Sequence, residues 1–310
     1  MLQIDFDTVH QLASAGSLIE PLRRAFGSAG SSPVRSHYDL PSPNLPRTLL
    51  LMPSWRRDGG IGVKIVTVFP ENGARGQASV NAVYLLMSGQ TGQPSALIDG
   101  CALTQVRTAA VSALAADLLV PANPRRLLMV GTGALSRHLI AAHLAVRPYE
   151  SVQVWGRDRA KAAAVARDLA AKGCRITVAD DLQTAVRLAS VVSCATLAQQ
   201  PLIEGRWLDS AAHLDLVGSF RPDMREADDA CLDRAFIAVD TERALEESGD
   251  LAEPIARGVV QARDICTLHA LLSTRCGAPR GSRTVFKSVG VALADLAVAE
   301  HLVERSGGSR

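Results

Sequence analysis

The sequence of 310 residues is poor in aromatic side chains, which make up 4% of it against 47% for all hydrophobic residues. Its core is therefore expected to be aliphatic, which suits helices packed on a parallel sheet with continuous apolar strands. An excess of charge is also lacking, because 33 Lys and Arg face 31 Asp and Glu and leave a net charge of +2. No basic block interleaved with aromatics occurs, so nothing favours nucleic-acid binding.

Metal-binding, secretion and membrane patterns are absent as well. We find no Cys-x-x-Cys spacing and no His-x-x-x-His pair, so we expect no metal and interpret the cysteines as reduced packing residues. The six are Cys101, Cys174, Cys194, Cys231, Cys266 and Cys276. Residues 1–7 carry acids early and lack the order of a signal peptide, and no uncharged apolar run is long enough to span a bilayer. We therefore expect a cytoplasmic protein with neither a membrane nor a nucleic acid as partner.

The chain divides into three regions of different patterning, residues 1–120, 121–282 and 283–310. The first region predicts a mainly antiparallel sheet followed by an alanine-rich helix over Leu103–Leu119. Its strand candidates are Leu49–Met52, Gly62–Val68, Val80–Leu86 and Ala96–Asp99. The second region alternates strands and helices, which predicts a doubly wound α/β sheet. Its strand candidates are Leu127–Val130, Val152–Trp155, Arg175–Val178, Val191–Ala195, Leu214–Val217 and Phe236–Val239. For the third region we predict one helix, Thr284 to Val303, which folds back onto the first.

A glycine turn follows the first strand of the second region. Gly131 and Gly133 form a Gly-x-Gly, and Ser136 stands where a Rossmann fingerprint usually has its third Gly or Ala. Glycines also end strands for purely steric reasons, but here a second strand follows one helix later, as a βαβ unit requires. The turn predicts a dinucleotide site in which a pyrophosphate meets free N–H groups at a helix start. We expect Gly131, Gly133, Ala134 and Leu135 to bind the cofactor.

The residues after the second strand bear on the choice of cofactor. Arg157, with Lys161 close behind, offers positive charge to a 2′-phosphate and favours NADPH. Asp158 leaves two alternatives open. As a helix N-cap it has no bearing on the cofactor, whereas as a ribose ligand it favours NADH.

Three cations stand in apolar stretches of the first region. Lys64 lies mid-strand, Arg107 lies in the alanine-rich helix, and Arg35 follows Pro33-Val34. A solvated strand face for Lys64 and a surface helix for Arg107 are the structural alternatives. Taken together, three cations without adjacent acids suggest a site for a small carboxylate, with Arg as a bidentate clamp.

Several segments, in the right order along nearly the whole chain, resemble the ornithine cyclodeaminase/mu-crystallin family. They are Val63–Val66, Asp99–Gly100, Thr104–Ala110, Gly131–Gly133 and Thr284–Ala292, the last followed by Asp295. The resemblance implies a Rossmann domain inserted into an α+β substrate-binding and dimerisation domain that the C-terminal helix completes. It also implies an active site in the cleft and a homodimer.

The resemblance also implies roles for individual residues. Substrate would be bound by Arg35, Lys64, Arg107 and Val289, with Arg47 as the competitor of Arg35 before a loop of variable length. The nicotinamide cofactor would be lined by Ser79, Gly133, Ala134, Thr196, Val217 and Ser288.

The loop after the fifth Rossmann strand departs from the cyclodeaminase pattern. Phe220 lies near the position of an Asp that handles the substrate amine, and Phe neither accepts a proton nor pairs with an ammonium group. The loop is instead similar to that of the ketimine reductases. We expect NADPH, or NADH, to reduce a small cyclic α-imino acid, giving proline or pipecolate, with Lys64 as the catalytic residue.

Other functions remain open at this stage. They are ornithine cyclodeamination, an alanine dehydrogenase-like reaction and non-catalytic NADPH binding of the crystallin kind. Asp215, which lies mid-strand, either orients a group of the site or makes a structural hydrogen bond.

Overall fold

The computed structural model describes residues 1–310 except 29, 43–45, 58, 171–174, 280 and 308–310. The chain forms two compact units, one of residues 1–107 and 291–310 and the other of residues 108–290. We call them unit 1 and unit 2. The boundaries expected at residues 120 and 282 fall inside unit 2. Helix α3 (Gly100–Leu119) runs unbroken across the division between the units at residues 107 and 108. The strand Thr284–Lys287 follows the boundary expected at residue 282 and still belongs to unit 2.

Unit 1 contains a seven-stranded, mainly antiparallel sheet of order β1-β7-β6-β5-β4-β2, with β3 also paired to β4. Only the β1–β7 pair is parallel among the described strands of this sheet. The strands are β1 (Leu2–Ile4), β2 (Gly30–Ser31), β3 (Ser36–Leu40), β4 (Arg47–Arg56), β5 (Ile61–Val68), β6 (Val80–Met87) and β7 (Pro94–Asp99). The helices are α1 (Phe6–Leu12), η1 (Ala15–Leu18), α2 (Ile19–Gly27), η2 (Pro70–Arg75), the start of α3, and α10 (Ala292–Arg305).

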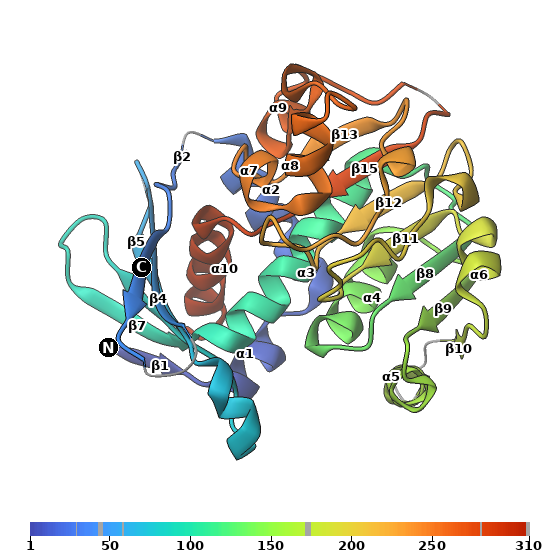
Figure 1. Ribbon diagram of the computed structural model, residues 1–310. Coiled ribbons are helices and arrows are strands. Elements are labelled where there is room, and N and C mark those ends of the chain that lie inside the picture. The colour runs from blue at the N-terminus through green and yellow to red at the C-terminus, as the bar shows by residue number, and fades with distance from the viewer. Residues whose placement is uncertain (29, 43–45, 58, 171–174, 280, 308–310) are drawn as a thin grey trace. The chain divides into compact units, whose positions relative to one another are not determined.

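The two faces of this sheet have different surroundings. Met52, Lys64 and Tyr84 lie opposite one another on β4, β5 and β6, and all three are buried. Helix α10 packs on these same strands and on α2 (Figure 1). Residues one position along point to the other face. That face leaves Ile65 36% and Val83 43% exposed.

Unit 2 is built on an eight-stranded sheet in which every pair of described strands is parallel. Its order is β10-β9-β8-β11-β12-β15-β13-β14. The strands are β8 (Arg126–Val130), β9 (Ser151–Trp155), β10 (Ile176–Val178), β11 (Val191–Cys194), β12 (His213–Leu216), β13 (Phe236–Val239), β14 (Cys266–Thr267) and β15 (Thr284–Lys287). The longer helices are α4 (Ala134–Val146), α5 (Arg159–Ala170), α6 (Leu182–Leu188) and α8 (Gly249–Ala256). The short ones are η3 (Gly205–Trp207), η4 (Asp229–Cys231), α7 (Ala244–Glu247), η5 (Ala262–Asp264) and α9 (Leu268–Leu272).

The prediction of one helix from Thr284 to Val303 is wrong at its start. Thr284–Lys287 is strand β15, which pairs with β12 on one side and β13 on the other and is buried along its length. Thr and Val are branched at Cβ, and with Phe286 they prefer a pleated, buried strand. Gly290, at φ +84°, follows the strand, and α10 begins at Ala292.

The core of unit 2 includes a buried polar network around Asp215. Its carboxylate accepts hydrogen bonds from Ser112 Oγ at 2.9 Å and Ser193 Oγ at 2.7 Å, and it lies 3.1 Å from His143 Nε2. These contacts join α3, α4, β11 and β12. These contacts favour the second alternative for Asp215, in which its carboxylate makes hydrogen bonds that hold the fold.

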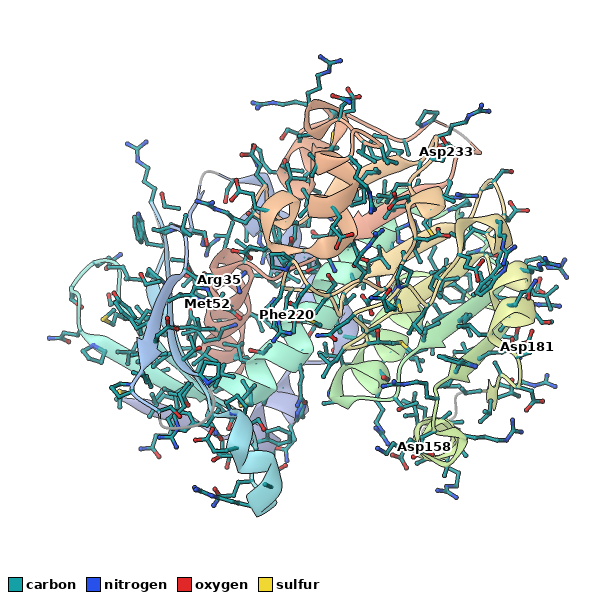
Figure 2. All side chains as sticks on the ribbon, viewed as in Figure 1. Arg35, Met52, Asp158, Asp181, Phe220 and Asp233 are labelled. Carbon is teal, nitrogen blue, oxygen red and sulfur yellow. A yellow bond between two sulfur atoms is a disulfide. The ribbon has the colours of Figure 1, made fainter. Side chains whose placement is uncertain are left out.

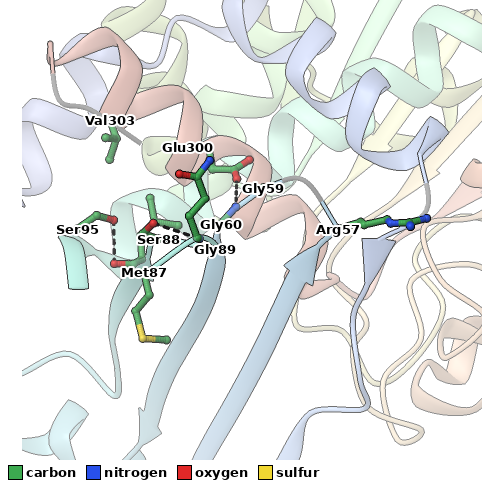
Figure 3. A pocket seen from close by; sticks show the side chains of 11 residues that line it. Arg57, Gly59, Gly60, Met87, Ser88, Gly89, Ser95, Glu300 and Val303 are labelled. Carbon is green, nitrogen blue, oxygen red and sulfur yellow. Dashed lines mark hydrogen bonds between the residues drawn. The ribbon is translucent and has the colours of Figure 1, made fainter. Parts of the chain in front are cut away.

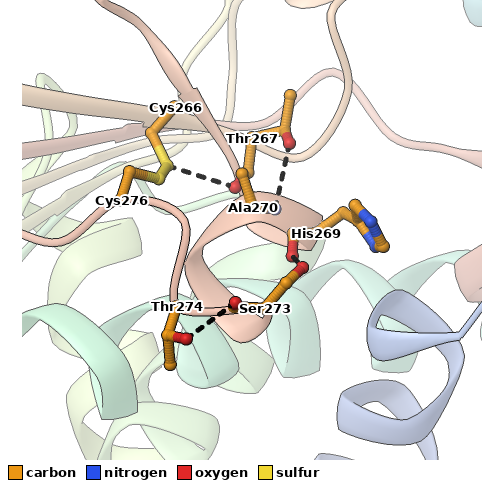
Figure 4. Close-up of a disulfide and its surroundings, with 7 residues drawn as sticks. All are labelled: Cys266, Thr267, His269, Ala270, Ser273, Thr274 and Cys276. Carbon is orange, nitrogen blue, oxygen red and sulfur yellow. Dashed lines mark hydrogen bonds between the residues drawn. A yellow bond between two sulfur atoms is a disulfide. The ribbon is translucent and has the colours of Figure 1, made fainter.

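The interpretation of all six cysteines as reduced is wrong for one pair. Cys266, at the start of β14, forms a disulfide with Cys276, beyond α9 (Figure 4). Cys101, Cys194 and Cys231 are free, and Cys174 lies outside the described residues. The spacing gave no signal, because the two cysteines lie ten positions apart and the backbone turn of α9 brings them together.

Among the described residues, no helix has both the length and the apolar character needed to cross a membrane.

Candidate active site

The turn after β8 forms a cradle for an anion. Gly131 has φ +123° and donates its backbone N–H to Trp155 O, and a Cβ at this position would collide with Ala195 O. Gly133 is the N-cap residue of α4, where no side chain caps the helix and a Cβ would meet open space. The N–H groups and positive dipole end of α4 therefore face space that a phosphate fits.

Ser136 takes the place of the third glycine without opening this turn. Its side chain is buried, and Oγ donates to Gly131 O at 2.9 Å. The hydroxyl thus ties the first turn of α4 to the end of β8.

A cavity of about 700 Å³ opens at the carboxyl ends of the parallel strands of unit 2. It is lined by residues that follow β8, β9, β11 and β12, which is where open α/β sheets bind their ligands. Of the residues expected at the cofactor, the cavity contains Gly131, Gly133, Ala134, Leu135, Arg157, Thr196 and Val217.

The other two residues expected at the cofactor do not line this cavity. Ser79 lies in unit 1 just before β6, where its carbonyl accepts a hydrogen bond from Phe69 N. Ser288 follows β15 in unit 2 and donates from Oγ to Asp240 at 2.8 Å. The same carboxylate accepts from Val289 N at 3.2 Å and from Gly290 N at 2.7 Å, so Asp240 fixes the whole segment.

The contacts of Asp158 decide between its two alternatives, helix N-cap and ribose ligand. Its carboxylate accepts from Ala160 N at 2.9 Å and Lys161 N at 3.2 Å, so it caps α5, where Figure 2 labels it. Arg159 forms an ion pair with Asp180. Arg157 lines the cavity, and no described residue forms an ion pair with it.

Unit 1 brings Lys64 and Arg107 to one buried acid. Lys64 Nζ lies 2.9 Å from Asp295 Oδ2, and Arg107 Nε donates to Asp295 Oδ1 at 2.8 Å. Lys64 is 2% exposed, Arg107 5% and Asp295 not at all. The solvated alternatives for both cations are therefore wrong. Asp295 was named from the sequence only as part of the family motif and not as the acid of these cations, although a lone carboxylate in the apolar first turn of α10 was a signal.

The electrostatics of this cluster lower the pKa of Lys64 to about 8. Burial is the main cause, and the charge of Arg107 acts in the same direction, while Asp295 opposes both. Arg35 adds to the lowering, which places it within electrostatic range of Lys64. Its competitor Arg47 pairs with Glu71 and lies over the ring of Phe69.

Phe220, the residue that departs from the cyclodeaminase pattern, lies at the cavity of unit 2 described above, which we call the dinucleotide cavity. Phe220 follows β12, lines the cavity and is 49% exposed (Figure 2). Val289, expected at the substrate, is 8% exposed and packs in the hydrophobic core cluster of unit 2.

A second cavity, of about 390 Å³, lies in unit 1 beside the turns that follow β4 and β6 (Figure 3). Its buried acid, Glu300, accepts from Gly60 N at 2.6 Å and forms an ion pair with Arg56. The carboxylate is therefore already neutralised within the unit.

The parallel sheet, its glycine turn and the cavity at its edge define a Rossmann-type dinucleotide-binding protein with a separate antiparallel unit. The model of the Ornithine cyclodeaminase/mu-crystallin family matches residues 3–309, and the chain belongs to this family. The resemblance inferred from the sequence and the expected fold class are confirmed.

Similar proteins support the assignment over most of the chain. "Protein SAR DEFICIENT 4" of Arabidopsis thaliana is 39% identical over 87% of this chain and 86% of its own length. The Delta(1)-pyrroline-2-carboxylate reductase of Colwellia psychrerythraea is 34% identical over 97% and 98%. The solved structure of Thermococcus litoralis Delta(1)-pyrroline-2-carboxylate reductase, in complex with NADH and L-proline, is 29% identical. It superposes with a TM-score of 0.92 over 100% of both chains.

Proposed function

We propose that the protein is an NAD(P)H-dependent reductase of small cyclic α-imino acids. It converts Δ1-pyrroline-2-carboxylate to L-proline and Δ1-piperideine-2-carboxylate to L-pipecolate. The observation that carries the proposal is the buried cluster of Lys64, Arg107 and Asp295. Two cations share one acid, so the cluster keeps a net positive charge, which suits a substrate with one carboxylate.

The arginine geometry of this cluster fits a carboxylate. Arg107 uses Nε for Asp295, and in the described part of the chain no acceptor is bonded to its two terminal nitrogens. These nitrogens form a fork that matches the two oxygens of a carboxylate. Arg35 supplies a second positive charge, which fixes the carboxylate and with it the adjacent imine carbon.

The reaction adds a hydride to the imine carbon and a proton to the imine nitrogen. A reduced nicotinamide supplies the hydride when it is bound. Lys64, held by Asp295 and by Thr104 Oγ1 at 3.3 Å, is the residue that gives the proton to the imine nitrogen. An imine that binds already protonated needs no separate acid. Phe220 offers no proton acceptor for the amine of an open-chain substrate, which favours imine reduction over cyclodeamination.

We propose NADPH as the preferred cofactor, with NADH also accepted. Arg157 lines the cavity, whereas the carboxylate of Asp158 is occupied in capping α5. A guanidinium without an ion-pair partner among the described residues favours a 2′-phosphate.

We also propose a homodimer formed through the outer face of the sheet in unit 1. Trp55, Ile65 and Val83 are 42%, 36% and 43% exposed there, and Ile65 and Val83 lie side by side on β5 and β6. An apolar sheet face of this kind is covered by the same face of a second copy in an isologous dimer. Ile65→Asp should give a monomer in size-exclusion light scattering, while Val259→Asp, on the exposed part of unit 2, should not.

The function is tested by following nicotinamide absorbance with each candidate substrate. We expect oxidation of NADPH with pyrroline-2-carboxylate or piperideine-2-carboxylate, and none with pyruvate plus ammonia. Incubation with ornithine should release no ammonia. Turnover with the open-chain substrates alone would favour the cyclodeaminase or dehydrogenase alternative. Absence of turnover with every substrate, across pH, would leave only non-catalytic binding.

A further inference from the structure

A buried carboxylate beneath the dinucleotide cavity has no part in the function proposed so far. Glu226, on the segment after β12, is fully buried. Its Oε1 accepts from Thr196 N at 2.6 Å and from Thr196 Oγ1 at 2.9 Å. Its Oε2 accepts from Gly218 N at 2.7 Å and Ser219 N at 3.3 Å. One side chain therefore joins the loop after β11 to the loop after β12.

Both of these loops line the cavity. Thr196, Val217 and Gly218 are all among its lining residues, whereas Glu226 itself is not. Gly218 has no room for a side chain, because a Cβ there would collide with Thr196 and Glu226. The close approach of the two loops thus depends on the carboxylate between them.

The backbone of Glu226 is fixed from both sides. Its N–H donates to Asp250 Oδ1 at 2.7 Å, and its carbonyl accepts from Leu202 N and Ile203 N at 2.9 and 3.0 Å. Asp250 in turn lies 3.3 Å from Lys287 Nζ, and both of these side chains are buried. The carboxylate is therefore held in place before any ligand arrives.

We propose that Glu226 is a positioning residue for the cofactor, whose ionised carboxylate holds the loops after β11 and β12 in the form that binds a nicotinamide dinucleotide. This inference rests on the proposed function, since it assumes that the cavity takes such a cofactor. All the neighbours of the carboxylate described above are donors, so only an acceptor on both oxygens satisfies them. A protonated carboxyl or an amide at this position would instead present an O–H or N–H group to one of these donors.

The charge of Glu226 is sensitive to pH. Burial raises its pKa to about 7, Lys287 of β15 opposes the rise, and Asp250 of α8 adds to it. The thiol of Cys194, on β11, also faces the carboxylate. As pH falls through about 7, the carboxylate gains a proton and loses an acceptor for one of its donors, so we expect its hold on the two loops to weaken.

The experiment measures the dissociation constant of NADH by fluorescence titration between pH 6 and 8.5, with no imine present. NADH is the probe because it lacks the 2′-phosphate, which itself titrates in this range. For the wild-type protein we expect the constant to rise as pH falls through about 7. For Glu226→Gln we expect binding about tenfold weaker at pH 8, as the loss of a charged hydrogen bond predicts, and no dependence on pH.

Two further variants separate positioning from folding. Glu226→Asp keeps the charge and should keep the pH dependence, while Glu253→Gln, which removes an acid of α8 bonded to Arg225, should bind as the wild type does. If Glu226→Gln does not fold by circular dichroism, the wild-type profile decides, and a flat profile overturns the inference. Wild-type affinity in a folded Glu226→Gln also overturns it. Failure of the wild type to bind either NADH or NADPH overturns the proposed function instead.

Discussion

At the scale of single residues, the proposed chemistry depends on charges that the fold removes from water. Lys64 and Arg107 are buried against Asp295, which is fully buried itself. Removing Asp295 would be costly, because it would leave two buried cations without a counter-charge in a low dielectric. In the proposed function, the two cations bind a substrate carboxylate, which gives this buried arrangement a role.

The first prediction concerns these two cations. Lys64→Met or Arg107→Met should lower kcat/KM for the imine by about a hundredfold, the loss expected from roughly two charged hydrogen bonds. The dissociation constant of NADPH should stay unchanged, because the cofactor cavity lies wholly in unit 2. Steady-state kinetics and cofactor titration measure the two effects.

The matched control for these variants is Arg47→Met. Arg47 is bonded to Glu71 and lies over Phe69, so its loss should change kcat/KM little. An effect as large as that of Arg107→Met would reassign the carboxylate site to Arg47.

The second prediction is a pH dependence caused by Lys64. Its pKa is lowered to about 8, mainly by burial, so Lys64 is protonated below that pH and neutral above it. With saturating cofactor, kcat/KM for the imine should be level below pH 8 and should fall as pH rises through about 8. A profile that stays level to pH 9.5 would remove Lys64 as proton donor.

At the scale of elements, the ends of the parallel strands decide where the cofactor is held. The turn from β8 to α4 offers N–H groups, and the turn from β9 to α5 offers Arg157. Because Asp158 is occupied in capping α5, Arg157 is the residue that we propose to contact the 2′-phosphate of the cofactor.

The third prediction follows from this division of roles. Arg157→Ala should reduce the preference for NADPH over NADH by about tenfold, which corresponds to one charge-assisted hydrogen bond. Arg159→Ala should leave the preference unchanged, because Arg159 forms an ion pair with Asp180 and does not line the cavity. The ratio of kcat/KM values for the two cofactors measures the effect, and equal changes in both variants would contradict the assignment.

The elements also show what can be predicted from the sequence. Alternating strands and helices indicated the parallel sheet, because continuous apolar runs and a Gly-x-Gly turn are local signals. Strand β15 was missed, since its four residues adjoin a helix and its place between β12 and β13 is set by pairing over a long sequence distance. The contacts of Asp295 and Asp240 were missed for the same reason, because their partners lie on other elements.

At the scale of the whole molecule, unit 1 carries the cation cluster and unit 2 carries the dinucleotide cavity. The proposed reaction needs both, because the carbon next to the bound carboxylate must receive the hydride. Composition and charge indicated an aliphatic core that suits helices on a parallel sheet, and gave no support for nucleic-acid binding. Which cations share an acid followed only from the folded structure.

The most direct test of the central claim follows the hydride itself. The enzyme is incubated with Δ1-pyrroline-2-carboxylate and nicotinamide cofactor carrying deuterium at both positions of C4, and the product is analysed by mass spectrometry. The account predicts L-proline with one deuterium at the α-carbon. Proline without deuterium, or deuterated cofactor recovered unchanged beside unreacted imine, would contradict it.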